Sequence, residues 1–359
     1  MNPGTKPLRL FTAFHANLDF SALPEADRST VIARCYWPLL ELPTEYGIPI
    51  GVELSARTLE ILLGEDPEWV KRFVGLAECG QIEPIASGRA QIVAPLAATE
   101  INRLNLKLGA EAYERLLGFV PSTYFVNEQT WSDGLAPLYG EIGAERVIME
   151  WNNPAAHRPE LRPLRLRSAR LRRSNGVGPA LLFNDSIVFQ KIQRAAHGET
   201  PVSEVADYIA ALAARPGAES LCFYGGDVEI FDYRPSRHAP SAGPGAGQEM
   251  TRLHALFRSF AEDPRYAFAL PREIVRGTND ESGSDQLPSL PVVALGSATD
   301  PIPCKKQPRY NPTRWAVSGR GRFALNSRCQ ALLKMERPVR RYGSIRPKVH
   351  RQVALVELC

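Results

Sequence analysis

The sequence predicts an α/β fold, a (β/α)7-type distorted TIM-like barrel followed by a partial, mainly helical C-terminal region. Three observations carry this prediction. Strand and helix signals alternate from the start, six apolar runs each stop at an acidic residue, and 359 residues exceed one small domain. A buried parallel strand reads as a short apolar run whose polar residues gather where the strand emerges. The acids at the stops are Glu53, Glu83, Glu128, Glu150, Asp185 and Asp227.

The barrel elements follow from local signals along the chain. We expect strands at residues 8–14, 48–53, 122–127, 146–150 and 220–224, and helices at 24–40, 58–63, 97–117, 131–142, 200–214 and 250–261. One more helix starts at Asp66, an N-cap residue followed by proline at the first helical position, and ends before Gly80. Because parallel strands open their carboxyl ends on one face, acids from distant strands can converge there.

One segment breaks the alternation. Residues 164–167 alternate leucine with arginine, and Asn175-Gly176 offers a two-residue turn before the apolar run that ends at Asp185. We expect a strand or hairpin whose arginines face solvent, in preference to a nucleic-acid patch. Asp185 is equally well explained as the cap of the next helix.

The composition changes after Pro235, and we expect three units. Residues 1–235 form the barrel, residues 236–290 a loop, helix and linker insertion, and residues 291–359 a basic C-terminal segment. Between Cys304 and Arg351 there are 14 Lys/Arg against one acid, whereas the rest of the chain has 29 against 38. Because apolar residues interrupt these charges, we expect the segment to pack as the start of an incomplete helical domain. The final VALVELC leads us to expect a truncated chain.

Composition excludes several classes of protein. No apolar run approaches the ~18 residues of a membrane span, and no signal-peptide segment develops before His15 and Asp19, so we expect a cytoplasmic protein. The six cysteines are scattered without metal-ligand spacing, and the six histidines lack an HxxxH pair. We therefore expect no metal and no cofactor.

Paired carboxylates at strand ends point to chemistry in which positive charge develops on the substrate. Glu128 and Asp227 lie about one hundred residues apart, each after an apolar run. In glycosyl transfer with retention, one carboxylate attacks the anomeric carbon and a second protonates the leaving oxygen, ~5–5.5 Å away. On a barrel rim the two can meet across one substrate. A structural or a hydroxyl-binding role stays open for Glu53 and Glu83.

The blocks GVELSARTLEIL, GQIEPIASG, YFVNEQTW and FYGGDVEIFDYRP, spread over about residues 8–235, resemble glycoside hydrolase family 57, and the basic block resembles its uncharacterised branch. The resemblance implies a retaining enzyme acting on α-glucans through a glutamyl-glycosyl intermediate. By the matching blocks, Glu128 is the nucleophile and Asp227 the acid/base, with Glu229 as a competitor for the second role. Glu83 is expected in the pocket. Hydrolysis, transfer and branching stay open, as does the oligomeric state.

Family members carry an HxHQP-like block after the first strand, whereas this chain has His15-Ala16-Asn17. His15 and Asn17 offer both donors and acceptors, so we expect them to bind sugar hydroxyls. Trp131 and Trp315 are candidates for stacking on a pyranose face. The expected partner is an oligo- or polysaccharide of the α-glucan class, with no membrane.

Three alternatives remain from the residues alone. A metal-dependent deacetylase lacks the histidine spacing it needs. A non-catalytic glucan-binding or regulatory protein on the same fold fits the altered histidine block. A nucleic-acid binder would use the basic segment, although the apolar residues that interrupt its charges favour a packed segment.

Overall fold

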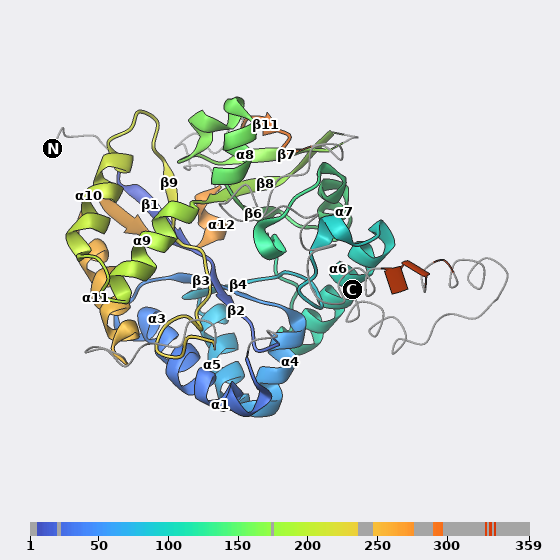
Figure 1. The fold of residues 1–359 in the computed structure, drawn as a ribbon, viewed down its shortest axis with the longest axis horizontal. Helices are drawn as coiled ribbons and strands as arrows, with labels where there is room; N and C mark the ends of the chain where they lie inside the picture. The colour runs from blue at the N-terminus through green and yellow to red at the C-terminus, as the bar shows by residue number, and fades with distance from the viewer. Residues whose placement is uncertain are drawn as a thin grey trace.

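The computed structural model describes residues 6–19, 23–173, 176–235, 247–275 and 290–296, with a few positions between 327 and 334. Within these ranges, strands occupy the centre and helices surround them (Figure 1). The expected α/β fold is thereby confirmed. Trp315 and nearly all of the predicted C-terminal region lie outside the described residues.

Seven strand positions follow one another around the centre and run in the same direction. They are β1 (Leu8–Thr12) with its continuation β2 (Phe14–Ala16), β3 (Ile50–Leu54), β4 (Ile82–Ile85), β5 (Thr123–Phe125), β6 (Arg146–Glu150), β8 (Gly176–Asn184) and β9 (Ser220–Tyr224). A bridge between Ala86 and Tyr124 joins β4 to β5. β9 returns to pair with β1, and Asn184 Nδ2 donates to Gly225 O at 2.8 Å, which links β8 to β9.

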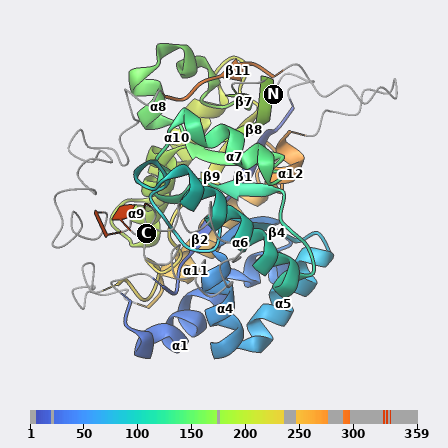
Figure 2. The ribbon, with the colours of Figure 1, turned by 90° about the vertical axis from the view of Figure 1, so that its right-hand side faces the viewer.

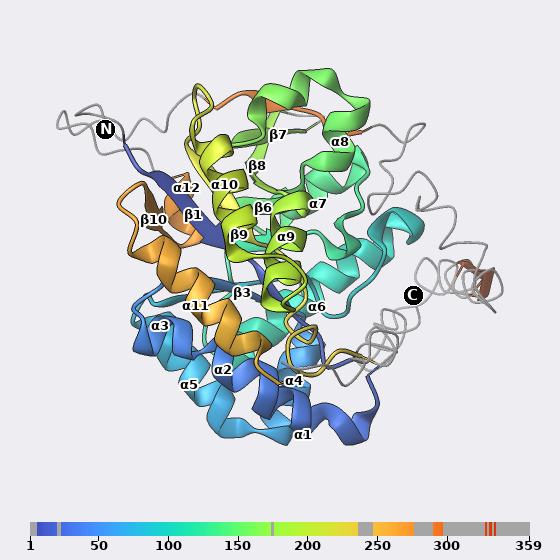
Figure 3. The ribbon, with the colours of Figure 1, turned by 60° about the vertical axis from the view of Figure 1, so that its left-hand side comes forward.

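Helices cover the outside of these strands. The longer ones are α4 (Ala56–Glu65), α5 (Pro67–Glu78), α6 (Thr99–Leu117), α7 (Ala136–Glu141), α9 (Ser186–Ala196), α10 (Val202–Ala213) and α11 (Glu249–Ala261). α9, α10 and α11 lie beside β9 and β1 (Figure 3). The expected cap at Asp66 is confirmed, since its Oδ1 accepts from Trp69 N at 3.0 Å, and Asp185 caps α9 in the same way.

The helix expected at residues 24–40 is confirmed as one helical run from Glu25 to Leu39, in which the hydrogen-bond pattern changes along the chain. Its parts are η1 (Glu25–Asp27), α1 (Arg28–Val31), the π-helical turn η2 (Ile32–Tyr36) and α2 (Trp37–Leu39), and α3 (Glu41–Glu45) follows. The π-helical turn comes shortly before Pro38, which lacks the backbone N–H of a regular α-helical bond. Further short turns are η3 (Ala94–Leu96), η4 (Asn127–Gln129), η5 (Asp133–Leu135), α8 (Asn152–His157) and η6 (Pro159–Leu164).

The predicted antiparallel hairpin is confirmed, but the expectation that its arginines face solvent is wrong for two of them, since Arg170 and Arg173 are half-buried and only Arg172 on β7 is exposed. β7 (Ala169–Arg173) pairs antiparallel with β8, and β11 (Val292–Val293) adds to the free edge of β7. Together with α8, these strands lie at the end of the molecule opposite α1, α4 and α5 (Figure 2).

The amino-terminal end of the barrel is closed by chain that follows α11. β10 (Tyr266–Phe268) pairs with β1, and α12 (Pro271–Ile274) follows it. Arg9 on β1 donates to the carbonyls of Glu273 and Ile274 at 2.8 and 2.7 Å, which holds α12 against the strand. The boundary expected at residue 235 stays a prediction, although β10, from beyond it, is part of the sheet around β1. No helix in the described ranges is long and apolar enough to cross a membrane.

Candidate active site

Every second side chain along each strand faces the barrel interior. These interior side chains are apolar in the middle of the barrel and polar toward the carboxyl ends of the strands. The middle is apolar and includes Ala13, Ile85, Phe125, Ile148 and Leu182. Side chains two residues apart on a strand point to the same face. The residue two positions after each of these apolar residues therefore also faces the barrel interior, one step closer to the carboxyl end. Glu53 belongs with them, since it pairs in register with Ile85 and with His15. We call these residues the polar layer: His15, Glu53, Ser87, Asn127, Glu150 and Asn184.

The polar layer is desolvated and has open hydrogen-bonding capacity. All of its members except the half-buried His15 are buried. Four of its oxygens have no hydrogen-bond partner among the described residues: Glu53 Oε1, Ser87 Oγ, Asn127 Oδ1 and Asn184 Oδ1. Buried polar atoms are nearly always paired. The four unpaired oxygens beneath the mouth of the barrel therefore leave hydrogen-bonding capacity that the described residues do not fill and that a polar ligand such as a sugar could use.

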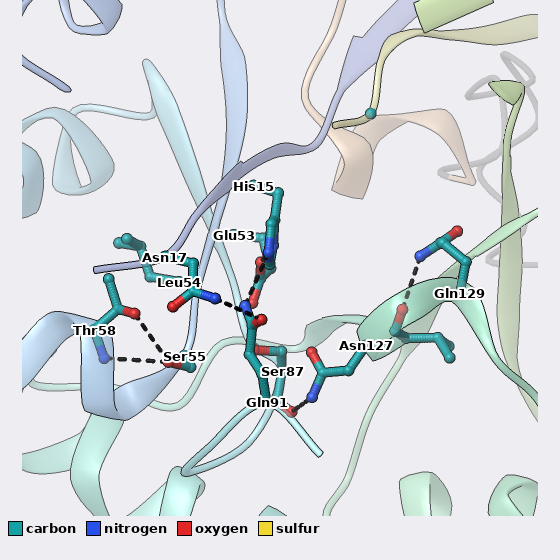
Figure 4. Close-up of polar contacts among 12 residues, drawn as sticks. His15, Asn17, Glu53, Leu54, Ser55, Thr58, Ser87, Gln91, Asn127 and Gln129 are labelled. Atoms are coloured by element: carbon teal, nitrogen blue, oxygen red, sulfur yellow. Dashed lines mark hydrogen bonds and ion pairs between the residues drawn. The ribbon is translucent and has the colours of Figure 1, made fainter. Parts of the chain in front are cut away.

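His15 is held at the centre of a hydrogen-bonded chain (Figure 4). Its Nδ1 contacts the Glu53 carboxylate, and its Nε2 lies 2.9 Å from Gln91 Nε2. Gln91 Oε1 in turn accepts from Asn17 Nδ2 at 2.8 Å. Burial alone would lower the His15 pKa, but the adjacent Glu53 carboxylate, with weaker help from Asp227 and Glu229, raises it to about 10. The ring is therefore charged at neutral pH and donates from both nitrogens, which requires the Gln91 side-chain amide to turn its oxygen toward Nε2.

The two carboxylates of the D-x-E block have different environments. Backbone hydrogen bonds from His15 N to Gly226 O and from Val228 N to His15 O, both 2.9 Å, align Asp227 beside His15. Asp227 is exposed at the barrel mouth. Glu229 is buried, and it accepts from Asn17 N at 2.6 Å and from the Tyr36 hydroxyl. Burial, and then the charge of Asp227, raise the pKa of Glu229 to about 7.

Glu128 lies in a sharp turn directly after β5. It and Gln129 have φ values of 54° and 53°, a left-handed conformation that non-glycine residues seldom adopt. Each such residue costs on the order of 1–3 kcal/mol, and such strain clusters at functional sites. The turn is held by Asn127, whose Nδ2 donates to Ser87 O at 3.1 Å, and by Gln129, whose Nε2 donates to Val126 O at 2.8 Å (Figure 4). The half-buried Glu128 is thereby fixed in position.

The strands that precede Glu128 and Asp227 lie on opposite sides of the barrel. Counting around the ring from β9, β5 is three strands away through β8 and β6, and four in the other direction. The interior between these two sides is narrow, because the His15 ring beside Asp227 stacks on Phe125 of β5 at a centroid distance of 5.8 Å. Glu128 and Asp227 therefore flank the same mouth.

Two other predicted site residues, Glu83 and Trp131, lie elsewhere. Glu83 is at the amino-terminal end of the barrel, where its carboxylate accepts from Thr123 Oγ1 at 2.5 Å and from Arg272 N at 2.6 Å. Burial raises its pKa. Trp131 is fully buried, with its ring stacked on Tyr139 and its Nε1 donating to an aspartate. Neither joins the polar layer, and Trp315 is outside the described residues. Asn17 does reach the layer, through Gln91.

Several residues of this site were not among the predicted ones, namely Gln91, Ser87, Asn127, Glu150 and Asn184. For Glu53 the sequence leaves a structural and a hydroxyl-binding role open, and the structure places it in the polar layer beside His15. Most of them can be identified by counting every second residue along a strand from an apolar residue that faces the interior. Taking the first acidic residue after an apolar run does not identify them. Gln91 lies in a loop, and nothing local in the sequence distinguishes it. Within the described ranges, no group of three His, Cys, Asp or Glu is arranged to hold a metal ion.

Comparison with known proteins gives a family and a set of similar folds. The model described as Glycosyl hydrolase family 57 matches residues 11–286. The chain is similar to a 4-α-glucanotransferase from Thermococcus litoralis, with a TM-score of 0.63 and 16% identity over 94% of this chain and 48% of that one. It is also similar to an α-amylase from Thermotoga maritima, with a TM-score of 0.60 and 13% identity over 81% and 77%.

A third similar structure is a branching enzyme from Pyrococcus horikoshii, with a TM-score of 0.56 and 14% identity over 86% of this chain and 76% of that one. The chain spans about half the length of the glucanotransferase. No curated protein sequence matches it.

Proposed function

Because the chain belongs to glycosyl hydrolase family 57, we propose that it acts on glycosidic bonds of α-glucans with retention of configuration. The three similar structures are by name a 4-α-glucanotransferase, an α-amylase and a branching enzyme, which supports the α-glucan class. The observation that carries the proposal is the pair of carboxylates, Glu128 and Asp227, on opposite sides of one barrel mouth above a buried polar layer.

In the first step, the Glu128 carboxylate attacks the anomeric carbon while Asp227 gives its proton to the leaving glycosidic oxygen. The carbon–oxygen bond to the leaving sugar breaks as the glycosyl ester to Glu128 forms. In the second step, water or a sugar hydroxyl attacks the same carbon, Asp227 takes its proton, and Glu128 leaves as a carboxylate. Water gives hydrolysis, and a sugar hydroxyl gives transfer.

The polar layer contributes binding and electrostatics to this proposal. Its open oxygens accept hydrogen bonds from sugar hydroxyls, and Asn17 extends the layer toward Glu229. The acidic side chains Glu53 and Glu150 are buried beneath the mouth. Because Glu53 is paired with the charged His15 ring, it adds no net charge there, and the ionised Glu128 carboxylate stabilises the positive charge that develops on the sugar ring. Glu229 takes no part in proton transfer to the substrate, because it is enclosed by Asn17 and Tyr36.

Azide rescue assigns the two roles separately. For Glu128→Ala, we expect turnover of an activated α-glucoside to fall by about 10⁴-fold or more. Azide should then restore it by attacking from the vacated nucleophile side, which gives the β-glucosyl azide. For Asp227→Ala, we expect a loss of about 10²–10⁴-fold. Azide should attack the glycosyl ester and give the α-glucosyl azide.

The matched control is Glu111→Gln, an exposed carboxylate on α6, which should leave turnover unchanged. If the two variants yield the same azide anomer, the assignment of roles is wrong. If both variants and the parent protein bind glucan with equal affinity and none has turnover, the protein is a non-catalytic glucan binder on this fold instead.

A further inference from the structure

A cleft of about 480 Å³ opens at the amino-terminal end of the barrel, away from the polar layer. Its walls come from β6, the β7–β8 hairpin and the loop after α7, and its charged lining consists of Arg146, Arg170, Arg173 and Glu145. Arg146 begins β6 and Glu150 ends it, so four residues at about 3.3 Å each separate this cleft from the polar layer. The volume is that of a small-molecule site.

Strand register builds the floor of this cleft. Arg146 on β6 and Arg170 on β7 are both paired with Ala180 on β8, one from each side. Side chains on one rung of a sheet point to the same face, and neighbouring strands lie about 4.8 Å apart. The two arginines therefore stand about 10 Å apart at their Cα atoms, with only the methyl group of Ala180 between them. That gap leaves room for a group contacted from both sides.

A third arginine reaches the cleft because two glycines make room for it. A Cβ on Gly140 would lie 2.5 Å from Arg173 Nη1, and a Cβ on Gly178 would lie 3.0 Å from Arg173 Cγ. The guanidinium of Arg173 thus rests on the backbone of α7, on the cleft side of the hairpin. Arg172, its neighbour on β7, is exposed and does not line the cleft.

Among the described residues, Arg146 has the carboxylates of Glu145 and Glu83 near it, whereas Arg170 forms no ion pair. Glu145, the one acid in the lining, accepts from Arg146 Nη1 at 2.8 Å and from Ser122. Within the described ranges, the Arg170 side chain donates to a backbone carbonyl, that of Gly178 at 3.2 Å, and to no carboxylate. The buried Nε atoms of Arg146 and Arg173 have no partner in the part of the chain that the structure describes. Glu141 lies near Arg173, but it is bound in two hydrogen bonds by Arg103.

We propose that this cleft binds the phosphate group of a small phosphorylated ligand, such as a sugar phosphate. A phosphate dianion carries several oxygens around one centre, and planar guanidinium groups match them with paired N–H donors. Arg146 and Arg170, on either side of Ala180, supply such donors from two sides, and Arg173 supplies them from a third. Enclosure by the hairpin and α7 favours a compact ligand over an extended polyanion.

Thermal unfolding with inorganic phosphate as the probe tests the site. At constant ionic strength, about 10 mM phosphate should raise Tm by about 2 °C or more, and chloride should not. Arg170→Gln and Arg173→Gln should each weaken phosphate binding by about 10- to 100-fold, as expected for the loss of a charged hydrogen-bond partner. Gly140→Ala should weaken it too, because it displaces the Arg173 guanidinium without removing charge. If Arg170→Gln fails to fold, the other two variants carry the test.

Arg172→Gln is the matched control, with the same change of charge on the same strand, and it should leave phosphate binding unchanged. Equal weakening by Arg172→Gln, or no response to phosphate in the parent protein, overturns the proposal. Asp280, Glu281 and Asp285 follow Val275 in the sequence. If phosphate binds only after these three acids are neutralised by substitution, the chain's own carboxylates compete for the cleft, and the proposal of a phosphate site is overturned. Glucose 1-phosphate distinguishes the source: tighter binding than inorganic phosphate supports a sugar phosphate, and equal binding supports the free anion.

Discussion

Replacing Glu53 with glutamine should change both the stability of the protein and its dependence on pH. The Glu53 side chain is fully buried, and that of His15 is 14% exposed, so water screens their ion pair little. The substitution keeps the size of the side chain but removes its charge. The buried imidazolium then loses its counter-ion, a change that costs about 3–5 kcal/mol.

The pH dependence follows from the pKa of His15. Its folded value of about 10 lies above the unfolded value of 6.5, so the pair contributes its full stability below pH 6.5 and loses it as pH rises toward 10. Each pH unit between these values corresponds to about 1.4 kcal/mol. In Glu53→Gln the burial of His15 favours the neutral ring, so this slope should disappear.

Urea unfolding of both proteins between pH 7 and 9 measures the difference. We expect the variant to be less stable by about 3–5 kcal/mol at pH 7 and the gap to narrow by roughly 2–3 kcal/mol at pH 9. Glu111→Gln, with its exposed carboxylate, should show a constant difference near zero. Parallel stability curves for the parent protein and Glu53→Gln would refute the argument that Glu53 keeps His15 charged.

Other substitutions test the packing around the site. Trp131→Ala should cost about 3–5 kcal/mol in urea unfolding because the ring is fully buried, whereas a rise in KM at unchanged stability would mean that it stacks on substrate. Gly51→Ala should destabilise by about 1–3 kcal/mol or more, since a Cβ would lie 2.3 Å from the backbone oxygen of Thr12, and an unchanged melting temperature would contradict this geometry. Asp66→Ala should cost about 1 kcal/mol as a lost cap. Asp185→Ala should cost about 3–5 kcal/mol, because it also removes the carboxylate partner of Arg165, whose side chain is 10% exposed; equal losses would show that this ion pair contributes nothing.

The sequence predicted the fold well where local signals and tertiary packing agree. The cap at Asp66, the antiparallel hairpin and the parallel strands all match the structure, and the resemblance to family 57 is confirmed by the match over residues 11–286. The strand β10 was not predicted, since it has three residues and no period can be read from so short a segment. Its pairing with β1 depends on contacts between residues more than two hundred and fifty positions apart.

The site was harder to predict because an acid after an apolar run does not mark the end of a strand. Glu83 is the second residue of β4, and the strand continues through Ile85 before it reaches the barrel mouth. Glu53, by contrast, is the fourth of five residues in β3 and lies beside His15. The two glutamates have similar local sequences, so only strand register separates them. Burial of Trp131 was equally invisible, because stacking on Tyr139 depends on how η5 and α7 fold together.

Trapping with a fluorinated glucosyl donor, followed by peptide mass spectrometry, tests the central claim most directly. Fluorine on the sugar slows both steps, and an activated leaving group keeps the first step faster than the second, so the glycosyl ester accumulates. We predict a glucosyl label on the Glu128 side chain, absent from Glu128→Ala and retained in Asp227→Ala. A label on any other carboxylate, or inverted product without a covalent intermediate, would contradict the account.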